Sequence, residues 1–423
     1  MSRFATLPDP TAPVRVVQVG AGGMGRAWLR LLGESADVEL AGVVDLNPQA
    51  ARDALAELGL DAVPVGTSLT ELAGAVGAQA VVNVTVPAAH HPVNVEAHFL
   101  GLPVLCEKPA APTVAEALSL AAVAEATGQL LMISQSRRYF RTLTAFRRQA
   151  DRLGAIGLLT CDFFKAPHFG GFREEMEHVL LVDMAIHAFD AARYLLGRNP
   201  VSVYCEEFNP GWSWYAGDAA ATAVFEMDGG TRFVYTGSWC ADGLETSWNG
   251  SWRINGADGT AVWDGAAAPV AERVAGASAD DVLADDGGVT GSVSSAPDSV
   301  VAEGDAAAEG PSEGPEEIAG ALAEFVRSLR TGEVPSGEIH ANVLSLAMVE
   351  AAVKSSQTGQ RVLISDVLDE AHRQALAAES VPAAREVLAA WASPLEALQA
   401  VGELQVAGQP GRAVQPAASA TLG

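Results

Sequence analysis

Three ionisable side chains of this sequence are suited to proton transfer on a bound molecule. Lys108 follows the apolar run 104–106 within Glu107-Lys108-Pro109, so a buried strand would present it at the sheet edge where ligands bind. Asp183 and His187 are four residues apart in an apolar segment, and an α-helix would project both from one face. An acid one turn from a histidine can fix its tautomer and raise its basicity, as general acid–base catalysis requires. A purely structural Asp–His hydrogen bond is the alternative interpretation.

A glycine-rich turn near the N-terminus has the pattern of a phosphate-binding loop. Gly20, Gly22 and Gly25 follow the β-branched run 14–19 and precede a helical stretch, 26–32. In such a turn the first glycine permits the tight bend, the second lets backbone approach a pyrophosphate, and the third lets helix and strand pack closely. The helix N-terminus then attracts the anion. An ordinary strand–helix turn is the alternative.

An acidic residue after the next strand indicates which dinucleotide binds. The run 38–44 ends on Asp45, twenty positions after Gly25, where a carboxylate can bind an adenosine ribose and repel a 2′-phosphate. Residues 46–48 contain no arginine or lysine that would favour a 2′-phosphate. The sequence therefore predicts NAD as cofactor in preference to NADP.

A doubly wound, mostly parallel α/β sheet would position the glycine turn, Asp45 and Lys108. Six strands alternating with helices are expected, and the apolar runs include 14–20, 38–44, 80–86, 103–106 and 130–134. The third of these runs ends on Thr85-Val86-Pro87, and His90-His91 open the helix that follows. We expect this NAD-binding Rossmann domain to span residues 1–135.

The pattern changes after residue 136 to that of an α+β domain with a large open, mostly antiparallel sheet. A basic helix (141–152) and the helix Val179–Leu196 are followed by strands without intervening helices, at 201–208, 221–227, 232–239 and 251–254. This domain is expected to span 136–365, and its acidic low-complexity insertion (264–317) contains a possible strand at 268–275. Helices are expected at 318–330 and 342–355 and a strand at 361–364. Residues 366–423 have the pattern of two or three Ala-rich helices of unassigned function and a frayed tail.

Composition excludes several classes of partner. The net charge of −26 argues against nucleic acid, because phosphate binding needs a basic face. No apolar run approaches the roughly 20 residues of a membrane span, and the first 13 residues lack the apolar stretch of a signal peptide. Four widely spaced cysteines predict reduced thiols and a cytoplasmic location.

Taken together, the motifs resemble those of the glucose–fructose oxidoreductase / inositol dehydrogenase / rhizopine-catabolism (Gfo/Idh/MocA) family. The glycine turn, Asp45, Pro87 with His91, Glu107-Lys108-Pro109 and Asp183-x-x-x-His187-x-x-Asp190 occur in that family's order and spacing, over roughly residues 14–365. One departure is that His178-Val-Leu-Leu-Val precedes Asp183, where many relatives have a glycine-rich run. The substrate loop is therefore expected to differ.

The resemblance implies an active site between the two domains. In it Lys108 would hydrogen-bond the reacting oxygen, His187 would act as general acid/base, and Asp183 would position the substrate or the histidine. The implied cofactor site comprises Gly20, Gly22, Gly23, Met24, Gly25, Asp45, Thr85, Pro87, His91, Glu107 and Lys108. Glu107 is expected to shape the turn or pair locally rather than react. The resemblance also implies a homo-oligomer, a dimer or tetramer, with the open sheet as its interface.

Several further residues have two interpretations. Arg173 and His178 are candidate substrate contacts, or residues of a solvated loop. His90 or His91 could face the nicotinamide or substrate, or could cap a helix or lie exposed. Five tryptophans, at positions 212, 214, 239, 248 and 252, suit a sugar-binding chamber, but equally burial in the sheet or in a subunit interface.

The leading hypothesis is an NAD-dependent dehydrogenase acting on a secondary hydroxyl or ketone of a carbohydrate-like substrate, a sugar, cyclitol or derivative. A second is an NAD-dependent glycoside hydrolase that oxidises its substrate transiently. A third is a non-catalytic NAD-binding sensor or scaffold, which would need the glycines and Asp45 but not Lys108, Asp183 and His187.

Overall fold

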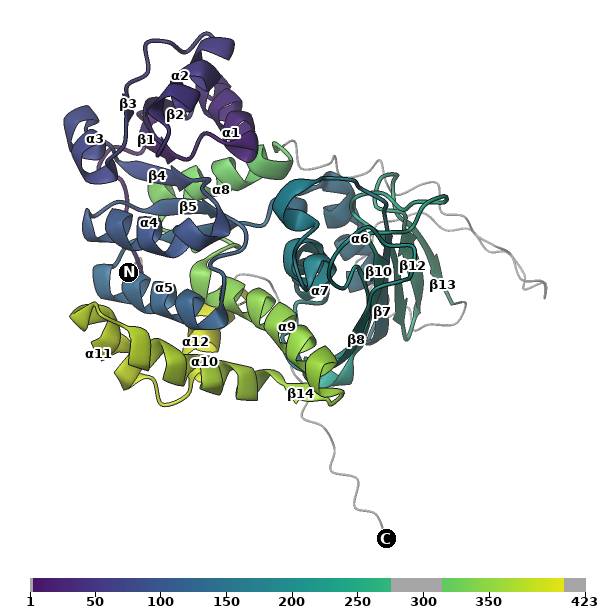
Figure 1. Cartoon of the computed structure of the whole chain (residues 1–423). Coiled ribbons are helices and arrows are strands. Elements are labelled where there is room, and N and C mark those ends of the chain that lie inside the picture. Colours follow the sequence, from purple (N-terminus) through teal and green to yellow (C-terminus); the bar gives the residue numbers. More distant parts are fainter. Residues whose placement is uncertain (1–2, 275–313, 407–423) are drawn as a thin grey trace, which may run out of the picture.

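The first domain of the protein is a parallel six-stranded sheet (Figure 1). The computed structural model describes residues 3–274 and 314–406, without the side chains of 401–406. The strand order β3-β2-β1-β4-β5-β6 reverses direction between β1 and β4, the kind of switch point at which α/β sheets bind ligands. The predicted doubly wound sheet is confirmed. Its strands are β1 (Val14–Val19), β2 (Val38–Val44), β3 (Val65–Gly66), β4 (Ala80–Asn83), β5 (Val104–Glu107) and β6 (Leu131–Ser134).

Helices cover both faces of this sheet because each strand is apolar on both sides. Val14 and Val16 of β1 belong to the core under Trp28 of α1, whereas Val17 and Val19 belong to the core on the opposite face. The helices between the strands are α1 (Gly23–Glu34), α2 (Pro48–Glu57), α3 (Leu69–Val76), α4 (Pro87–Phe99) and α5 (Val114–Thr127). A late helix, α8 (Glu317–Thr331), returns to the α1 face and buries Phe325 there.

The second domain is an eight-stranded, mostly antiparallel sheet, as predicted. Its order is β13-β12-β11-β7-β10-β9-β8-β14, and the pairing of β7 with β10 is parallel. The helices α6 (Arg141–Asp151) and α7 (Ile186–Leu196) lie on one face, where the Phe189 ring contacts the rings of Phe225 and Tyr235. The strands are β7 (Ile156–Phe164), β8 (Pro200–Phe208), β9 (Ala220–Met227), β10 (Arg232–Ser238), β11 (Ser251–Gly256), β12 (Gly259–Trp263), β13 (Val270–Arg273) and β14 (Val362–Leu363).

The helix predicted over Val179–Leu196 is wound differently from expectation. Its first part, Leu180–Ala185, is a π-helix, and α-helical geometry begins only at Ile186. A π-turn has a wider i→i+5 hydrogen-bond pattern and occurs frequently at functional sites. Residues four apart across it are therefore not stacked as they are in an α-helix.

Four helices near the C-terminus connect and support the two domains. The buried helix α9 (Ile339–Thr358) packs against α5, α7 and β8. The helices α10 (Ile364–Ala378) and α11 (Pro382–Ala390) pack on α5, and α12 (Pro394–Val406) packs on α9. The expected C-terminal helices are thus present and form part of the core through Val367, Leu368 and Leu388. The predicted frayed tail (407–423) and residues 275–313 of the acidic insertion lie outside the described residues.

The described residues contain no helix with the length and apolar character of a membrane span. All four cysteines are unpaired and buried.

A buried charge cluster fixes the start of α9 against the first domain. Nδ1 of His340 lies 2.7 Å from Oε1 of Glu338, and its Nε2 lies 2.9 Å from Oε1 of Glu125 in α5. Burial opposes a charge on the imidazole, but the Glu338 and Glu125 carboxylates outweigh it and raise the pKa of His340 to about 9. The protonated form of His340 therefore stabilises the fold.

We predict a pH-dependent loss of stability in His340→Gln. A raised pKa in the folded state gives stabilisation that is complete below the unfolded pKa near 6.5 and is lost as the pH rises through about 9. The variant should lose roughly 2–3 kcal/mol of unfolding free energy at pH 6 and much less at pH 10. Urea denaturation of both proteins at the two pH values measures this. A deficit that does not change with pH would show that the imidazolium is not the stabilising species.

Candidate active site

A cleft of about 1950 Å³ is lined by residues of both domains. Its first-domain wall includes the glycine turn and the end of β5, and its second-domain wall includes the π-helix and the loop 247–249. Most residues predicted for the site line it: Gly20, Gly22, Gly23, Met24, Asp45, Thr85, Pro87, Glu107, Lys108, Arg173, His178, Asp183 and His187. Gly25 and His91 do not.

The glycine turn has space for a phosphate. Gly20 has φ +97°, and a Cβ there would meet the Val84 carbonyl oxygen at 2.6 Å. A Cβ on Gly25 would meet the Gly20 oxygen at 2.6 Å, so Gly25 serves close packing of helix on strand behind the cleft. By contrast, a Cβ on Gly22 or Gly23 would meet nothing within 4 Å. The open side of the turn thus lies over the N-terminus of α1, as the pyrophosphate of a dinucleotide requires.

Asp45 lies at the cleft end of β2. Its Oδ2 accepts a hydrogen bond from the Ala21 N–H at 2.8 Å and its Oδ1 accepts one from the Asn47 N–H at 2.7 Å. These two bonds fix the carboxylate beside the glycine turn. A ribose placed by the pyrophosphate would meet this carboxylate, so the residues present fit NAD.

Lys108 and Asp183 join the two domains across the cleft. Nζ of Lys108 donates to the Asp183 carbonyl oxygen at 2.9 Å and lies 3.3 Å from its Oδ1. Nε of Arg173 donates to Oδ2 of the same carboxylate at 2.6 Å. Burial alone would raise the pKa of Asp183, but Lys108 and Arg173 outweigh it and hold that pKa below its usual value. Asp183 is therefore ionised and orients both cations.

His187 is half-buried beside this cluster and makes no hydrogen bond to Asp183. Its Nδ1 has no hydrogen-bond partner among the described residues. Burial, and then the positive charges of Arg137 and Lys108, lower the pKa of His187 well below its usual value. Asp183 therefore does not fix the tautomer of His187. The Asp183 carboxylate binds Lys108 and Arg173 instead, and the π-turn separates the Asp183 and His187 side chains. His187 is a neutral imidazole that can accept a proton.

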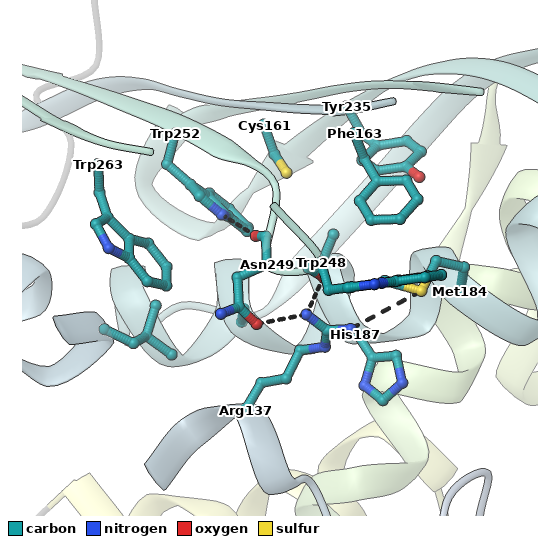
Figure 2. Close-up of a pocket in the computed structure, with 13 residues that line it drawn as sticks. Arg137, Cys161, Phe163, Met184, His187, Tyr235, Trp248, Asn249, Trp252 and Trp263 are labelled. Atoms are coloured by element: carbon teal, nitrogen blue, oxygen red, sulfur yellow. Dashed lines mark hydrogen bonds between the residues drawn. The ribbon is translucent and has the colours of Figure 1, made fainter. Parts of the chain in front are cut away.

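Arg137 is a site residue that the sequence analysis did not identify. Figure 2 shows its guanidinium between Asn249, Trp248 and Met184, close to His187. It donates to Oδ1 of Asn249 at 2.5 Å and to the Trp248 carbonyl oxygen. Burial lowers the pKa of Arg137 to about 10, so the group stays charged at neutral pH. Its position just after β6, at the carboxyl edge of the sheet, was the available signal.

Glu107 supports the Lys108 turn, as expected. Its Oε1 accepts from the Trp28 indole N–H at 2.9 Å, and its Oε2 accepts from the Lys108 backbone N–H at 3.2 Å. His90 also supports this turn, because its Nδ1 lies 2.6 Å from the Pro109 carbonyl oxygen. The ring is buried and does not line the cleft.

The predicted cofactor contact of His91 does not fit the structure. Its Nε2 lies 2.9 Å from Oγ of Ser119 in α5, and that hydroxyl donates to the carboxylate of Glu379 after α10. The imidazole therefore points to the junction with the C-terminal helices, where the Ser119 hydroxyl is the hydrogen-bond partner of its Nε2.

Asp190 does not join Asp183 and His187 at the cleft. It forms a buried, bidentate ion pair with Arg138, at 2.7 and 2.6 Å, and accepts from the Ser345 hydroxyl at 2.7 Å. This pair connects the end of β6, α7 and α9. Asp190 is thus a structural residue that holds α7 in place under the site.

The tryptophan cluster divides between the two interpretations. Trp239 and Trp252 are buried in the core of the second domain. Trp248 is 45% exposed and lines the cleft, where a sugar ring could stack on it. Trp212 is exposed outside the cleft.

Comparison with known proteins identifies the family. The model of the oxidoreductase family with an NAD-binding Rossmann fold matches residues 14–135, and the model of the GFO/IDH/MocA C-terminal domain matches residues 147–262. The chain belongs to the Gfo/Idh/MocA family. It is therefore an oxidoreductase with an NAD-binding first domain, as the glycine turn and Asp45 indicated.

Individual Gfo/Idh/MocA relatives match at moderate identity. The protein y4oX of Sinorhizobium fredii is 30% identical over 262 residues, 59% of this chain and 72% of its own length. Inositol 2-dehydrogenase of Streptomyces avermitilis is 33% identical over 192 residues, 44% of this chain and 54% of its own. An Agrobacterium radiobacter oxidoreductase solved with NAD+, L-tartaric acid and magnesium shares the fold, with a TM-score of 0.69 at 18% identity over 84% of this chain and 99% of that one.

We predict that Gly22→Val weakens NAD binding without unfolding the protein. The Cβ would project into the open space over α1, where a bound pyrophosphate would lie, and meets no protein atom within 4 Å. The dissociation constant for NAD, measured by titration calorimetry, should rise roughly tenfold or more, which corresponds to at least about 1.4 kcal/mol.

Gly74→Val in α3 is the matched control, because a Cβ there also meets nothing within 4 Å and the residue does not line the cleft. Its NAD affinity should equal that of the wild type. Equal affinity in both variants would place the cofactor elsewhere.

Proposed function

We propose that the protein is an NAD-dependent dehydrogenase that transfers a hydride between nicotinamide and a secondary hydroxyl or ketone of a sugar, cyclitol or derivative. The observation that supports this most directly is that Lys108, Asp183 and His187 line the same cleft as the glycine turn and Asp45. An NAD-binding site thus adjoins a cation and a neutral imidazole, the groups that alcohol oxidation requires.

The proposed roles follow from the charge state of each group. Lys108 donates a hydrogen bond to the reacting oxygen and stabilises the alkoxide charge that develops there. His187, held neutral by burial and by Arg137 and Lys108, accepts the hydroxyl proton at a ring nitrogen. Asp183 keeps the Lys108 ammonium directed across the cleft. Bound NAD supplies the carbon that takes the hydride.

The substrate class rests on the character of the second-domain wall. Arg173 lines the cleft with the exposed ring of Phe172, and its guanidinium carbon lies 4.9 Å from that ring centre. Trp248 adds an aromatic surface to the same wall. Cations that donate several hydrogen bonds, together with an aromatic face, suit a polyhydroxylated ring. Inositol 2-dehydrogenases among the relatives support a cyclitol as the first compound to test.

The glycoside hydrolase remains the second candidate, because transient oxidation would use the same lysine and histidine. Accumulation of NADH together with an oxidised product supports the dehydrogenase. Cleavage of an aryl glycoside while NAD is recycled supports the hydrolase. A sensor or scaffold would produce neither signal.

We further propose a cytoplasmic homo-oligomer, a dimer or tetramer. The location is supported by four unpaired cysteines, since disulfides persist in oxidising compartments. The assembly is supported by the outer face of the second sheet, where Val201, Tyr204 and Val262 are exposed on strands whose other face is covered by α6 and α7.

We predict that Lys108→Ala lowers kcat for polyol oxidation with NAD roughly 100- to 1,000-fold, because it removes the cation that stabilises the developing alkoxide. Initial rates of NADH formation from a panel of cyclitols and sugars measure the effect. The NAD dissociation constant should change little.

Lys354→Ala is the matched control, since this lysine pairs with Glu370 and does not line the cleft. Its kcat should equal that of the wild type. A Lys108→Ala enzyme within a few-fold of wild-type turnover would refute the proposed role of Lys108.

A further inference from the structure

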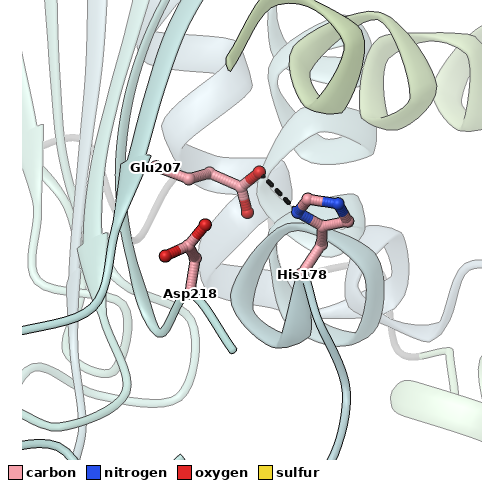
Figure 3. A group of neighbouring side chains, drawn as sticks. All are labelled: His178, Glu207 and Asp218. Carbon is pink, nitrogen blue, oxygen red and sulfur yellow. Dashed lines mark ion pairs between the residues drawn. The ribbon is translucent and has the colours of Figure 1, made fainter. Parts of the chain in front are cut away.

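We propose that His178, Glu207 and Asp218 bind one divalent transition-metal ion beside the cleft. The three residues come from separate segments: His178 precedes the π-helix, Glu207 is in β8, and Asp218 precedes β9. One ligand atom from each lies within 4.8 Å of the other two (Figure 3). An imidazole nitrogen with two carboxylate oxygens is a ligand set that Zn²⁺ and Mn²⁺ accept.

The buried carboxylate of Glu207 is the second observation that indicates a cation. Its side chain is 0% exposed, and neither oxygen has a partner with hydrogen-bond geometry among the described residues. Nδ1 of His178 lies 2.8 Å from one oxygen. Among the described residues this imidazole is the ion-pair partner of the buried carboxylate, and a metal ion bound between the three side chains would compensate its charge more fully.

The backbone holds these side chains together independently of any ion. The Ala216 N–H donates to the Glu174 carbonyl oxygen at 2.8 Å, and the Asp218 N–H donates to the Glu177 carbonyl oxygen at 2.7 Å. Between them, a Cβ on Gly217 would lie 2.2 Å from the Glu177 oxygen, so only glycine permits this approach. The loop that contains Asp218 is thereby fixed against the segment that contains His178.

A further contact suits the imidazole of a metal ligand. Nε2 of His178 lies 3.2 Å from the side-chain amide nitrogen of Gln357 in α9. When Nδ1 binds a metal, Nε2 carries the hydrogen, and a flip of the amide presents its oxygen as acceptor. Metal-bound histidines usually donate their second N–H in this way.

The site adjoins the proposed active site and shares the cleft residue His178 with it, but not Lys108, Asp183 or His187. His178 lines the cleft, five positions before Asp183. Three protein ligands leave a four-coordinate ion one position for a further oxygen ligand. Hydride transfer as proposed uses Lys108 and His187, so metal binding is measured separately from turnover and from NAD binding.

The test is metal titration of the full chain after dialysis against a chelator. Calorimetry with ZnCl₂ and MnCl₂, and elemental analysis after gel filtration, should give one ion per chain. Glu207→Gln and Asp218→Asn should each weaken binding roughly tenfold or more, since each removes a charged ligand. Glu206→Gln is the matched control: it is the adjacent residue of β8 and exposed, and it should bind like the wild type.

Each outcome is decisive because folding is monitored separately, by circular dichroism and by NAD titration. If Glu207→Gln does not fold, metal titration of Asp218→Asn, a change on the partly exposed loop, still tests the site. A wild type that binds neither ion, or Glu207 and Asp218 variants that bind like the wild type, would overturn the proposal and leave a His178–Glu207 ion pair. Loss of metal binding with unchanged NAD affinity would support the site whatever the substrate is.

Discussion

The carboxylate of Asp183, shared by two cations, is the interaction on which the site depends. Lys108 reaches it from the end of β5 in the first domain, and Arg173 reaches it from the loop before the π-helix in the second. The two cations compensate the cost of removing this half-buried carboxylate from water. The domains must therefore pack so that the lysine is held over the second-domain wall, and α9, packed against both, keeps them there.

Three cationic side chains line this cleft, together with acidic ones, in a chain with a net charge of −26. Lys108, Arg137 and Arg173 line it, and burial together with the charges of Arg137 and Lys108 lowers the pKa of His187. Cations in a partly desolvated cleft stabilise negative charge on a reacting oxygen more strongly than they would in water. The same cations help to keep His187 neutral, which is the form that accepts a proton in the proposed mechanism.

The sequence predicted those parts of the site that depend on local structure. Gly22, Asp45 and Lys108 each follow a strand of a parallel sheet, so their common edge could be predicted from strand periodicity alone. His91 was misplaced because the network that holds it joins distant parts of the chain: Ser119, its partner, donates to Glu379, which is 260 residues from that serine. The partner of Asp190, Arg138, is likewise 52 residues away. The four-residue spacing of Asp183 and His187 predicts a shared face only in an α-helix, whereas the chain forms a π-turn at Asp183. Arg137 follows β6 at the same edge, but its contacts with Trp248 and Asn249 are more than 100 residues away in the chain, so local pattern did not single it out.

In the proposed mechanism Lys108 and His187 act as one unit from opposite walls of the cleft. A double-mutant cycle on kcat/KM with Lys108→Met, His187→Gln and the combined variant tests it directly, with the substrate identified in the polyol screen. Residues that act as a unit are strongly non-additive, so the double variant should lose about as much activity as the worse single variant. If the loss of kcat/KM in the double variant equals the product of the two single losses, the two residues act independently and the proposed unit is wrong.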